Sequence, residues 1–215
     1  MNTTQFANWL PTLLEGLLTT SIASVLSIVT AVIWGSLVAI LISLENKALT
    51  PILRVYTSVF RNSPLLVQMF FLYYALPYVG ITMPALMCGV IAITLNEGAF
   101  IAEILRGNAK NIPRGEIEAA NSMALSKFQI ATRIIFPLSF RNSIPMLTGQ
   151  SSIVIKDTSL FSMIMILDLT RAGSVFYSKF FDTASFYIVG LLYLGLFLVF
   201  SLIGKQVEKR ISVKR

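Results

Sequence analysis

The sequence contains no histidine and only one cysteine, Cys88. Imidazole is the commonest metal ligand in proteins, so we expect no metal site, and a single cysteine cannot form a disulfide within one chain. The phosphate-binding pattern Gly-x-x-x-x-Gly-Lys-Ser/Thr is also missing, because the pair Gly204–Lys205 lacks the upstream glycine. We therefore expect no catalytic residues, no ATP hydrolysis by the chain itself and no bound cofactor.

Charged residues are scarce, and they avoid long apolar stretches. Only 13% of the residues are charged, whereas 55% are hydrophobic and the mean hydropathy is +0.77. The stretch from Gly16 to Leu44 carries no charge, and about twenty apolar residues suffice to cross a bilayer. We predict an all-α polytopic membrane protein, one domain over residues 1–215, whose five transmembrane helices lie at about 14–44, 63–80, 84–105, 140–165 and 184–204.

The basic residues fall between these spans rather than on one compact face. No lysine or arginine precedes Lys47, and 14 of the 17 lie in the first loop, in the stretch from Arg106 to Arg141 and in the tail from Lys205 to Arg215. Loops rich in lysine and arginine stay in the cytoplasm, so we predict an outside N-terminus and a cytoplasmic C-terminus. We expect membrane lipid, and no nucleic acid, as a partner.

The polar stretch from Pro113 to Pro137 is the most informative part of the chain. Ile117, Ala120, Ala124 and Phe128 follow one another at helical spacings of three, four and four. This predicts a short amphipathic cytoplasmic helix with small alanines on one face. Such a helix can lie on the bilayer or dock into a groove of a partner protein, and the pattern alone does not choose between them.

Four segments resemble the permease subunits of ATP-binding-cassette (ABC) importers. Residues 118–137 are similar to the EAA loop of that family, although Ala124 stands where glycine is usual and Phe136 where leucine is usual. The other three segments are RNSPLLVQ (residues 61–68), NEGAFIAEILRG (residues 96–107) and KDTSL (residues 156–160). The last is similar to a signature of the polar amino acid branch, which carries histidine, glutamate, glutamine, arginine or opines.

The resemblance implies a function for the chain and for its EAA loop. It implies the permease subunit of a bacterial inner-membrane importer that works by alternating access with a second permease, identical or different, an extracytoplasmic amino-acid-binding protein and a dimer of ATPase subunits that hold ATP and Mg²⁺. In such permeases the EAA loop is a coupling helix, which seats in a cleft of the ATPase. Carried over to this sequence, the coupling residues are Glu118, Ala119, Ala120, Ala124 and Arg114.

Several charged or polar residues within or near the spans are candidates for a substrate path, because charges at bilayer depth are costly and face an interior or a water-filled route. Lys156 and Asp157 lie about 20 Å along the fourth expected span, and neighbouring helical residues point apart. Each then needs its own partner, which a zwitterionic amino acid supplies. The full candidate set is Lys156, Asp157, Thr158, Ser159, Glu97 and Arg171.

Each of these residues also has a structural alternative. Lys156 and Asp157 can brace a kink or pair with another span, Glu97 can make a structural hydrogen bond, and Arg171, in an outer re-entrant stretch, can be solvated or contact lipid headgroups. Glu103 is expected to pair with Arg106, three residues on.

Two other classes of function compete with an importer subunit. An ion-coupled secondary transporter of amino acids would also carry charges at midplane, often within inverted repeats, and this sequence has no evident repeat. A membrane-embedded enzyme would need a nucleophile–base pair or a metal cluster, for which histidine is missing.

Overall fold

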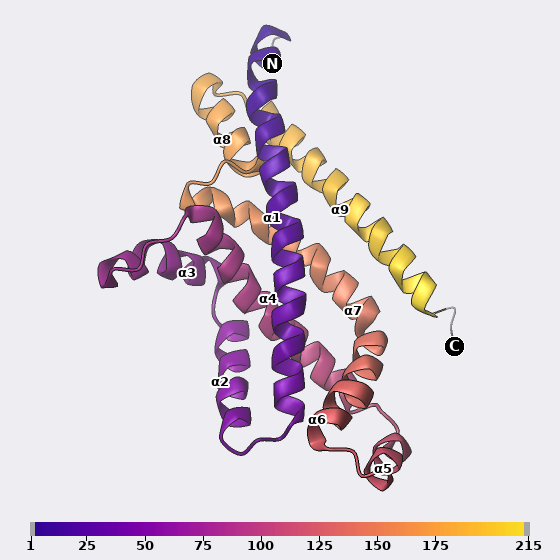
Figure 1. Cartoon of the computed structure of the whole chain (residues 1–215). Coiled ribbons are helices and arrows are strands. Elements are labelled where there is room, and N and C mark those ends of the chain that lie inside the picture. Colours follow the sequence, from indigo (N-terminus) through magenta and orange to yellow (C-terminus); the bar gives the residue numbers. More distant parts are fainter. Residues whose placement is uncertain (1–2, 213–215) are drawn as a thin grey trace.

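The computed structural model describes residues 3–212, and all regular structure within that range is helical (Figure 1). In chain order the elements are α1 (Thr3–Ser43), α2 (Leu49–Asn62), α3 (Leu65–Phe70), the π-helical turn η1 (Phe71–Ala75), the 3-10 turn η2 (Leu76–Val79), α4 (Ala85–Ala109), α5 (Arg114–Ser122), α6 (Lys127–Ile130), the π-helical turn η3 (Ala131–Ile135), α7 (Phe136–Asp157), the 3-10 helix η4 (Thr158–Ile164), α8 (Leu169–Phe180) and α9 (Ala184–Ser212). Lys214 and Arg215, which belong to the predicted basic tail, lie outside the described residues.

The predicted all-helical membrane fold is confirmed, and three helices are long and apolar enough to cross a bilayer. These are α1, α4 and the part of α9 from Ala184 to Arg210. The expected span at 63–80 is instead a shorter apolar segment, Leu65–Val79, divided among α3, η1 and η2. The α7 helix has 22 residues, enough to cross a bilayer by length, but its polar side chains lower its hydropathy below that of the other three.

The boundaries of two expected spans were wrong. The first helix begins at Thr3 rather than near residue 14, because Trp9 and Leu13 are buried in a cluster with Phe176 and Leu169 of α8. The fourth helix ends at Asp157 rather than near residue 165. There the chain tightens into η4, and the Thr158 hydroxyl donates to the Ile155 carbonyl at 2.7 Å.

Two helices, α2 and α8, were not expected at all. Pro51 lies in the first turn of α2, where a backbone N–H has no helical partner to lose. In α8, Asp168 caps the helix by accepting a hydrogen bond from the Arg171 amide at 2.8 Å. Both helices are amphipathic rather than wholly apolar, so a search for long apolar runs passes over them.

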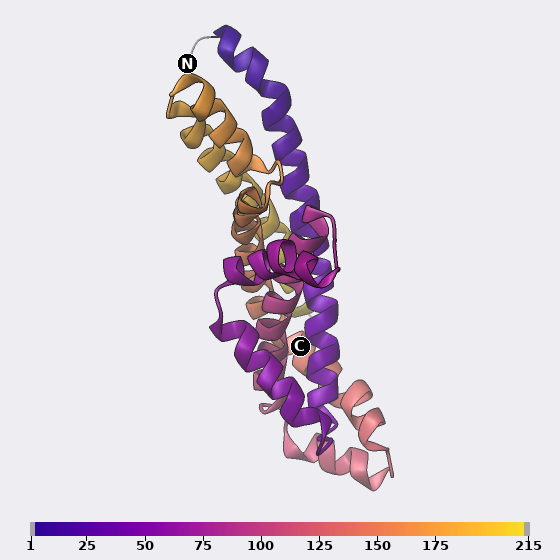
Figure 2. The same ribbon diagram turned by 90° about the vertical axis from the view of Figure 1, so that its left-hand side faces the viewer.

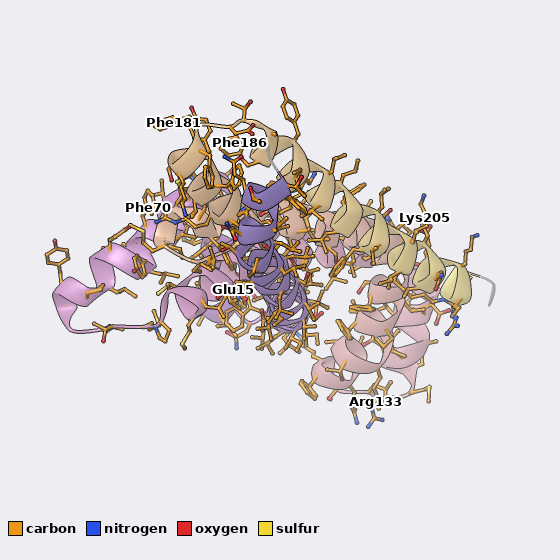
Figure 3. All side chains as sticks on the ribbon, turned by 90° about the horizontal axis from the view of Figure 1, so that it is seen from above. Glu15, Phe70, Arg133, Phe181, Phe186 and Lys205 are labelled. Carbon is orange, nitrogen blue, oxygen red and sulfur yellow. The ribbon has the colours of Figure 1, made fainter. Side chains whose placement is uncertain are left out.

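The molecule is elongated, and α1 runs along much of its length (Figures 1 and 2). The N-terminal part of α1 lies near α8 at one end, whereas the α1–α2 connection lies with α5 and α6 at the opposite end. The segment from α3 to η2 runs crosswise to this direction in both views. Seen from above, Phe70 lies on the opposite side of α1 from Lys205 of α9 and from Arg133 (Figure 3).

The most extensive helix-to-helix contact in the described part of the chain joins α1 to α4. A Cβ atom added at Gly35 would stand 2.6 Å from the carbonyl oxygen of Gly98 and 2.7 Å from Cβ of Ile101. The hydroxyls of Thr30 and Thr94 hydrogen-bond at 2.6 Å beside this crossing. Small residues and hydroxyl pairs at the contact are what hold helices together in a membrane, where lipid provides no hydrophobic drive between them.

Polar side chains tie α1 to its other neighbours in both halves of the helix. In the N-terminal half of α1, the Trp9 indole donates to the Ala172 carbonyl at 2.9 Å, and the Thr20 hydroxyl accepts from the Leu169 amide at 3.1 Å. Near the C-terminal end, the Trp34 indole donates to the Tyr56 hydroxyl of α2 at 2.7 Å. Because α1 is continuous, it connects α8 and α2 through one rigid element.

Candidate functional site

A cluster of polar side chains lies between α4 and α7. Glu97 of α4 is buried, with 2% of its surface exposed, and its Oε2 accepts a hydrogen bond from Nε2 of Gln150 at 2.5 Å. The carboxyl group of Asp157 lies within hydrogen-bonding reach of that of Glu97. Two adjoining carboxyl groups with one neutral amide make a site that attracts a cationic group.

The neighbouring candidates differ in how available they are. The Lys156 side chain is exposed, and it leaves α7 in a different direction from the side chain of Asp157. Thr158 is fully buried, and its hydroxyl is already used within η4, so it does not present a free donor. Ser159 is half-buried. The structure therefore brings Glu97 and Asp157 together but not all six candidates.

Asn96, which neighbours Glu97, has a structural partner. Its Nδ2 donates to the Phe60 carbonyl at 2.7 Å, at the C-terminal part of α2. This bond fixes α4 against α2 just before the RNSPLLVQ segment. Asn96 therefore positions the helix that carries Glu97.

Arg171 lies far along the chain from the carboxyl cluster. It is the third residue of α8 and half-buried, and its backbone amide serves the Asp168 cap. The carboxylate of Asp168 also accepts a hydrogen bond from the Tyr193 hydroxyl of α9 at 3.2 Å. The segment is a helix tied to its neighbours, and within residues 3–212 no hydrogen bond or ion pair joins Arg171 to Glu97 or Asp157.

The expected pair between Glu103 and Arg106 is confirmed. Arg106 Nε donates to Glu103 Oε2 at 3.0 Å, and Arg61 of α2 approaches the same oxygen at 3.7 Å. The Arg61 guanidinium also lies over the ring of Phe100, 5.2 Å from its centre. Glu103 is therefore the anchor of a link between α2 and α4, which the sequence pair alone did not reveal.

The continuous amphipathic helix expected from Pro113 onward was wrong. The α5 helix ends at Ser122, the chain turns at Met123 and Ala124, and α6 begins at Lys127. Ala120 is buried within the chain, with 3% exposed, whereas Ala124 and Phe128 are exposed. The four residues predicted on one face therefore divide between an inward and an outward side.

The turn explains why a family pattern would prefer glycine at position 124. Ala124 has a φ of 53°, in the left-handed region, and the Leu125 amide donates to the Ala120 carbonyl at 3.3 Å. This is the hydrogen bond of a Schellman cap, whose left-handed residue is usually glycine. Alanine there holds its Cβ in a strained position.

Replacing Ala124 by glycine is expected to stabilise the chain by about 1 kcal/mol, because glycine adopts this φ without strain. The matched control is Ala119→Gly, on the exposed side of α5, which should destabilise it by roughly 0.5–1 kcal/mol through the poorer helix propensity of glycine. Thermal unfolding of both variants in detergent checks the pair. Equal shifts of the same sign would contradict the left-handed assignment.

Gln150 is the functional candidate that sequence reasoning missed. It precedes Asp157 by seven residues, which is two helical turns, so the two side chains share one face of α7. Two polar residues on one face of a helix that is expected to cross the membrane indicate a polar site on that face, so this spacing could have identified Gln150. The amide of Gln150 is the direct partner of Glu97.

Comparison with known proteins gives a family match over most of the chain. Residues 31–213 match the model described as the binding-protein-dependent transport system inner membrane component. A putative glutamine transport system permease protein of Rickettsia conorii is 34% identical over 206 residues, which is 94% of this chain and 93% of that protein. The glutamine transport system permease protein of Escherichia coli is 33% identical over 207 residues, covering 95% and 94% of the two chains.

Solved structures give the same fold. A crystal structure of an amino acid ABC transporter with histidines matches with a TM-score of 0.84 and 26% identity, covering 98% of this chain and 99% of that one. An inward-facing methionine ABC transporter matches with a TM-score of 0.81 over the same shares of the two chains, and at 18% identity it speaks for the fold alone.

Proposed function

This chain belongs to the family of inner-membrane components of binding-protein-dependent transport systems and is a permease subunit of an ABC importer, and from this premise we propose that the solute it carries is a polar amino acid. Two observations support this substrate class. The similar permeases of Rickettsia conorii and Escherichia coli are named for glutamine. The segment from Lys156 to Leu160 lies beside a carboxyl cluster suited to an ammonium group.

The observation that carries the proposal is the pair of Glu97 and Asp157, with Lys156 adjacent in sequence. An amino acid presents an ammonium and a carboxylate on the same carbon, so it needs one acidic and one basic partner. We assign the ammonium to the carboxyl pair and the carboxylate to Lys156. Ser159 and Thr158 border the path through η4, and Arg171 contributes at its outer end if the substrate side chain is acidic.

The proposed topology has five membrane crossings. They are α1, the connection formed by α2 together with the crosswise segment from α3 to η2, α4, α7 and α9, and an odd number puts the two termini on opposite sides. The first basic loop and the α5–α6 region lie at one end of the molecule (Figure 1), which is consistent with both being cytoplasmic. The N-terminus is then outside, and residues 1–215 form a single transmembrane domain.

The proposed complex contains partners that supply the energy for transport and that capture the amino acid outside the membrane. Two ATPase subunits hold ATP and Mg²⁺, a second permease completes the path, and an extracytoplasmic protein delivers the amino acid. The chain itself performs no covalent chemistry. ATP-driven closure of the ATPases moves the coupling segment and reorients the helices around the path.

The coupling contact is assigned to the exposed side of α5. Arg114, Glu118 and Ala119 are exposed, and the adjoining turn carries Met123, which is 73% exposed. Ala120 supports this surface from within, and Ala124 shapes the turn. Of the residues carried over from the EAA loop, Arg114, Glu118 and Ala119 thus form the contact surface, whereas Ala120 and Ala124 shape the segment that carries it.

Replacing Ala119 by tryptophan is expected to abolish co-purification of the ATPase, or to lower it severalfold, because a large ring overfills a groove shaped for a methyl group. Gln206→Trp, on the exposed end of α9, is the matched control and should leave the assembly intact. Quantitative pull-down with a tagged permease checks both. Wild-type recovery of the ATPase with Ala119→Trp would place the contact elsewhere.

The transport mechanism is tested with the native complex in sealed vesicles. Uptake of a labelled amino acid is expected to require ATP and the binding protein, and to stop on ATP depletion while proton and sodium gradients persist. Uptake that follows an imposed ion gradient without ATP would support a secondary transporter instead. Competition among unlabelled glutamine, glutamate, histidine and arginine identifies the substrate.

A further inference from the structure

A cavity lies away from the carboxyl cluster, at the end of the molecule where α1 leads into α2. It has a volume of about 240 Å³. Its walls come from four parts of the chain: the C-terminal end of α1 with the turn that follows it, Arg54 of α2, the C-terminal end of α4 with Lys110, and the junction of η3 with α7. This convergence of helix ends next to the first basic loop places the cavity at the boundary between membrane and water.

The inner wall of the cavity is apolar, and its hydroxyl groups are already satisfied. Leu105 and Ile42 are 1% and 5% exposed. The Ser139 hydroxyl donates to the Phe136 carbonyl at 3.0 Å, and the Ser43 hydroxyl donates to the Ile40 carbonyl at 2.6 Å. No free side-chain donor from these serines is left to hold a polar solute on the inner wall.

The rim of the cavity is cationic. Arg54, Arg106 and Lys110 line it, against a single carboxylate, Glu45. Arg106 is held by Glu103, but within residues 3–212 neither Arg54 nor Lys110 forms an ion pair, and both side chains are exposed. The rim therefore presents positive charge that the chain itself does not neutralise.

An apolar stripe leads from the cavity along α1. Ile40 lines the cavity, and Leu37, Ile33 and Val29 follow at spacings of three, four and four, so the four lie on one helical face. Leu37, Ile33 and Val29 are 44%, 64% and 50% exposed. The charged rim of the cavity thus continues into an exposed apolar surface on α1, of the kind that contacts lipid acyl chains.

We propose that this cavity binds the headgroup of an anionic phospholipid, with one acyl chain lying along the stripe from Ile40 to Val29. Basic pockets between transmembrane helices are known to suit anionic headgroups. A free phosphate would use the rim but not the apolar wall or the stripe, and a zwitterionic lipid would gain nothing net from the unpaired cations. The site goes beyond the transport path, and it joins α1 and α2 to the start of α7, just after the coupling region.

Native mass spectrometry of the full-length permease in detergent tests this site. Phosphatidylglycerol and phosphatidylcholine with identical acyl chains are titrated against wild-type protein, and wild type should retain phosphatidylglycerol preferentially. The double variant Arg54→Gln/Lys110→Gln is expected to bind phosphatidylglycerol at least about tenfold more weakly than wild type. Each basic residue near a membrane surface contributes a measurable attraction to anionic lipid, and the variant removes two. Neither residue forms an ion pair within the described part of the chain, so the fold should survive the change.

Two further variants test whether lipid binding depends on this cavity or only on the overall positive charge of the protein. Lys47→Gln/Lys127→Gln removes the same number of exposed charges from outside the cavity and should bind like wild type. Ala109→Trp fills the cavity without changing charge and should lose the preference.

Three results would overturn the proposal. They are equal retention of the two lipids by wild type, equal losses in the two double variants, and displacement of phosphatidylglycerol by millimolar inorganic phosphate. Displacement by phosphate would show that the cavity binds anions in general and does not recognise the acyl chain of a lipid.

Discussion

Replacing Asp157 by alanine is expected to lower ATP-driven uptake by the assembled complex at least tenfold at low substrate concentration. The variant removes one of the two carboxyl groups that meet between α4 and α7. A charge-assisted hydrogen bond to an ammonium group contributes about 1.5–3 kcal/mol, which is roughly a tenfold to hundredfold change in affinity. The loss should appear mainly as a higher half-saturating concentration, measured over a series of substrate concentrations.

Asp157→Asn separates a role in the path from a structural role. Asparagine keeps the size of the side chain and can still hydrogen-bond to Glu97, but it carries no charge. If the carboxylate binds the substrate, the asparagine variant loses uptake like the alanine variant while the complex assembles normally. Wild-type uptake by Asp157→Asn would show that the residue only braces the end of α7. Lys156→Ala should give a comparable loss of its own, because Lys156 is assigned to the carboxylate of the substrate rather than to its ammonium group.

Replacing Gly35 by alanine is expected to destabilise the protein by about 2–3 kcal/mol, or to prevent its recovery as a folded species. The new Cβ would meet the Gly98 carbonyl oxygen and Ile101 far inside normal contact distances, and one of these partners is backbone, which cannot move aside cheaply. Overpacking of a well-filled contact commonly costs 1–3 kcal/mol. The measurement is the midpoint of thermal unfolding in detergent, followed by size-exclusion chromatography.

Gly107→Ala provides a control with the same chemical change and the opposite expected sign. A Cβ at Gly107 meets no atom within 4 Å, and the residue lies inside α4. Alanine should there stabilise the helix by up to about 1 kcal/mol. Similar destabilisation by both variants would mean that the α1–α4 crossing is not as close as described.

Long-range composition predicted the class and the long helices well, because crossing a bilayer demands uninterrupted apolar residues whatever the details of packing. The helices α1, α4 and α9 all overlap stretches that hydropathy identified, although each extends beyond the expected span. Hydropathy gave wrong helix boundaries where tertiary contacts determine where a helix begins or ends. Whether Pro51 ends a helix or begins one depends on its position in the first turn, and Trp9 extends α1 only because α8 packs against it.

The candidate site was partly readable for a similar reason. Glu97 and Asp157 attract notice as charges in apolar surroundings, and the structure brings their carboxyl groups together. Their partner Gln150 carries no charge, so only its helical spacing from Asp157 pointed to it. The break at Ala124 could not be read from spacing, since a periodic pattern carries no information about a single left-handed residue.

The continuity of α1 has a mechanical consequence. A helix of 41 residues is about 60 Å long, and the close contact of Gly35 with α4 lies near one end of it. If that contact acts as a fulcrum, the arm toward Ser43 is about 12 Å and the arm toward Thr3 about 48 Å. A rod with these proportions turns a shift of about 1 Å beside α2 into an opposite swing of about 4 Å beside α8. The first helix is then a lever whose short arm lies near the coupling end.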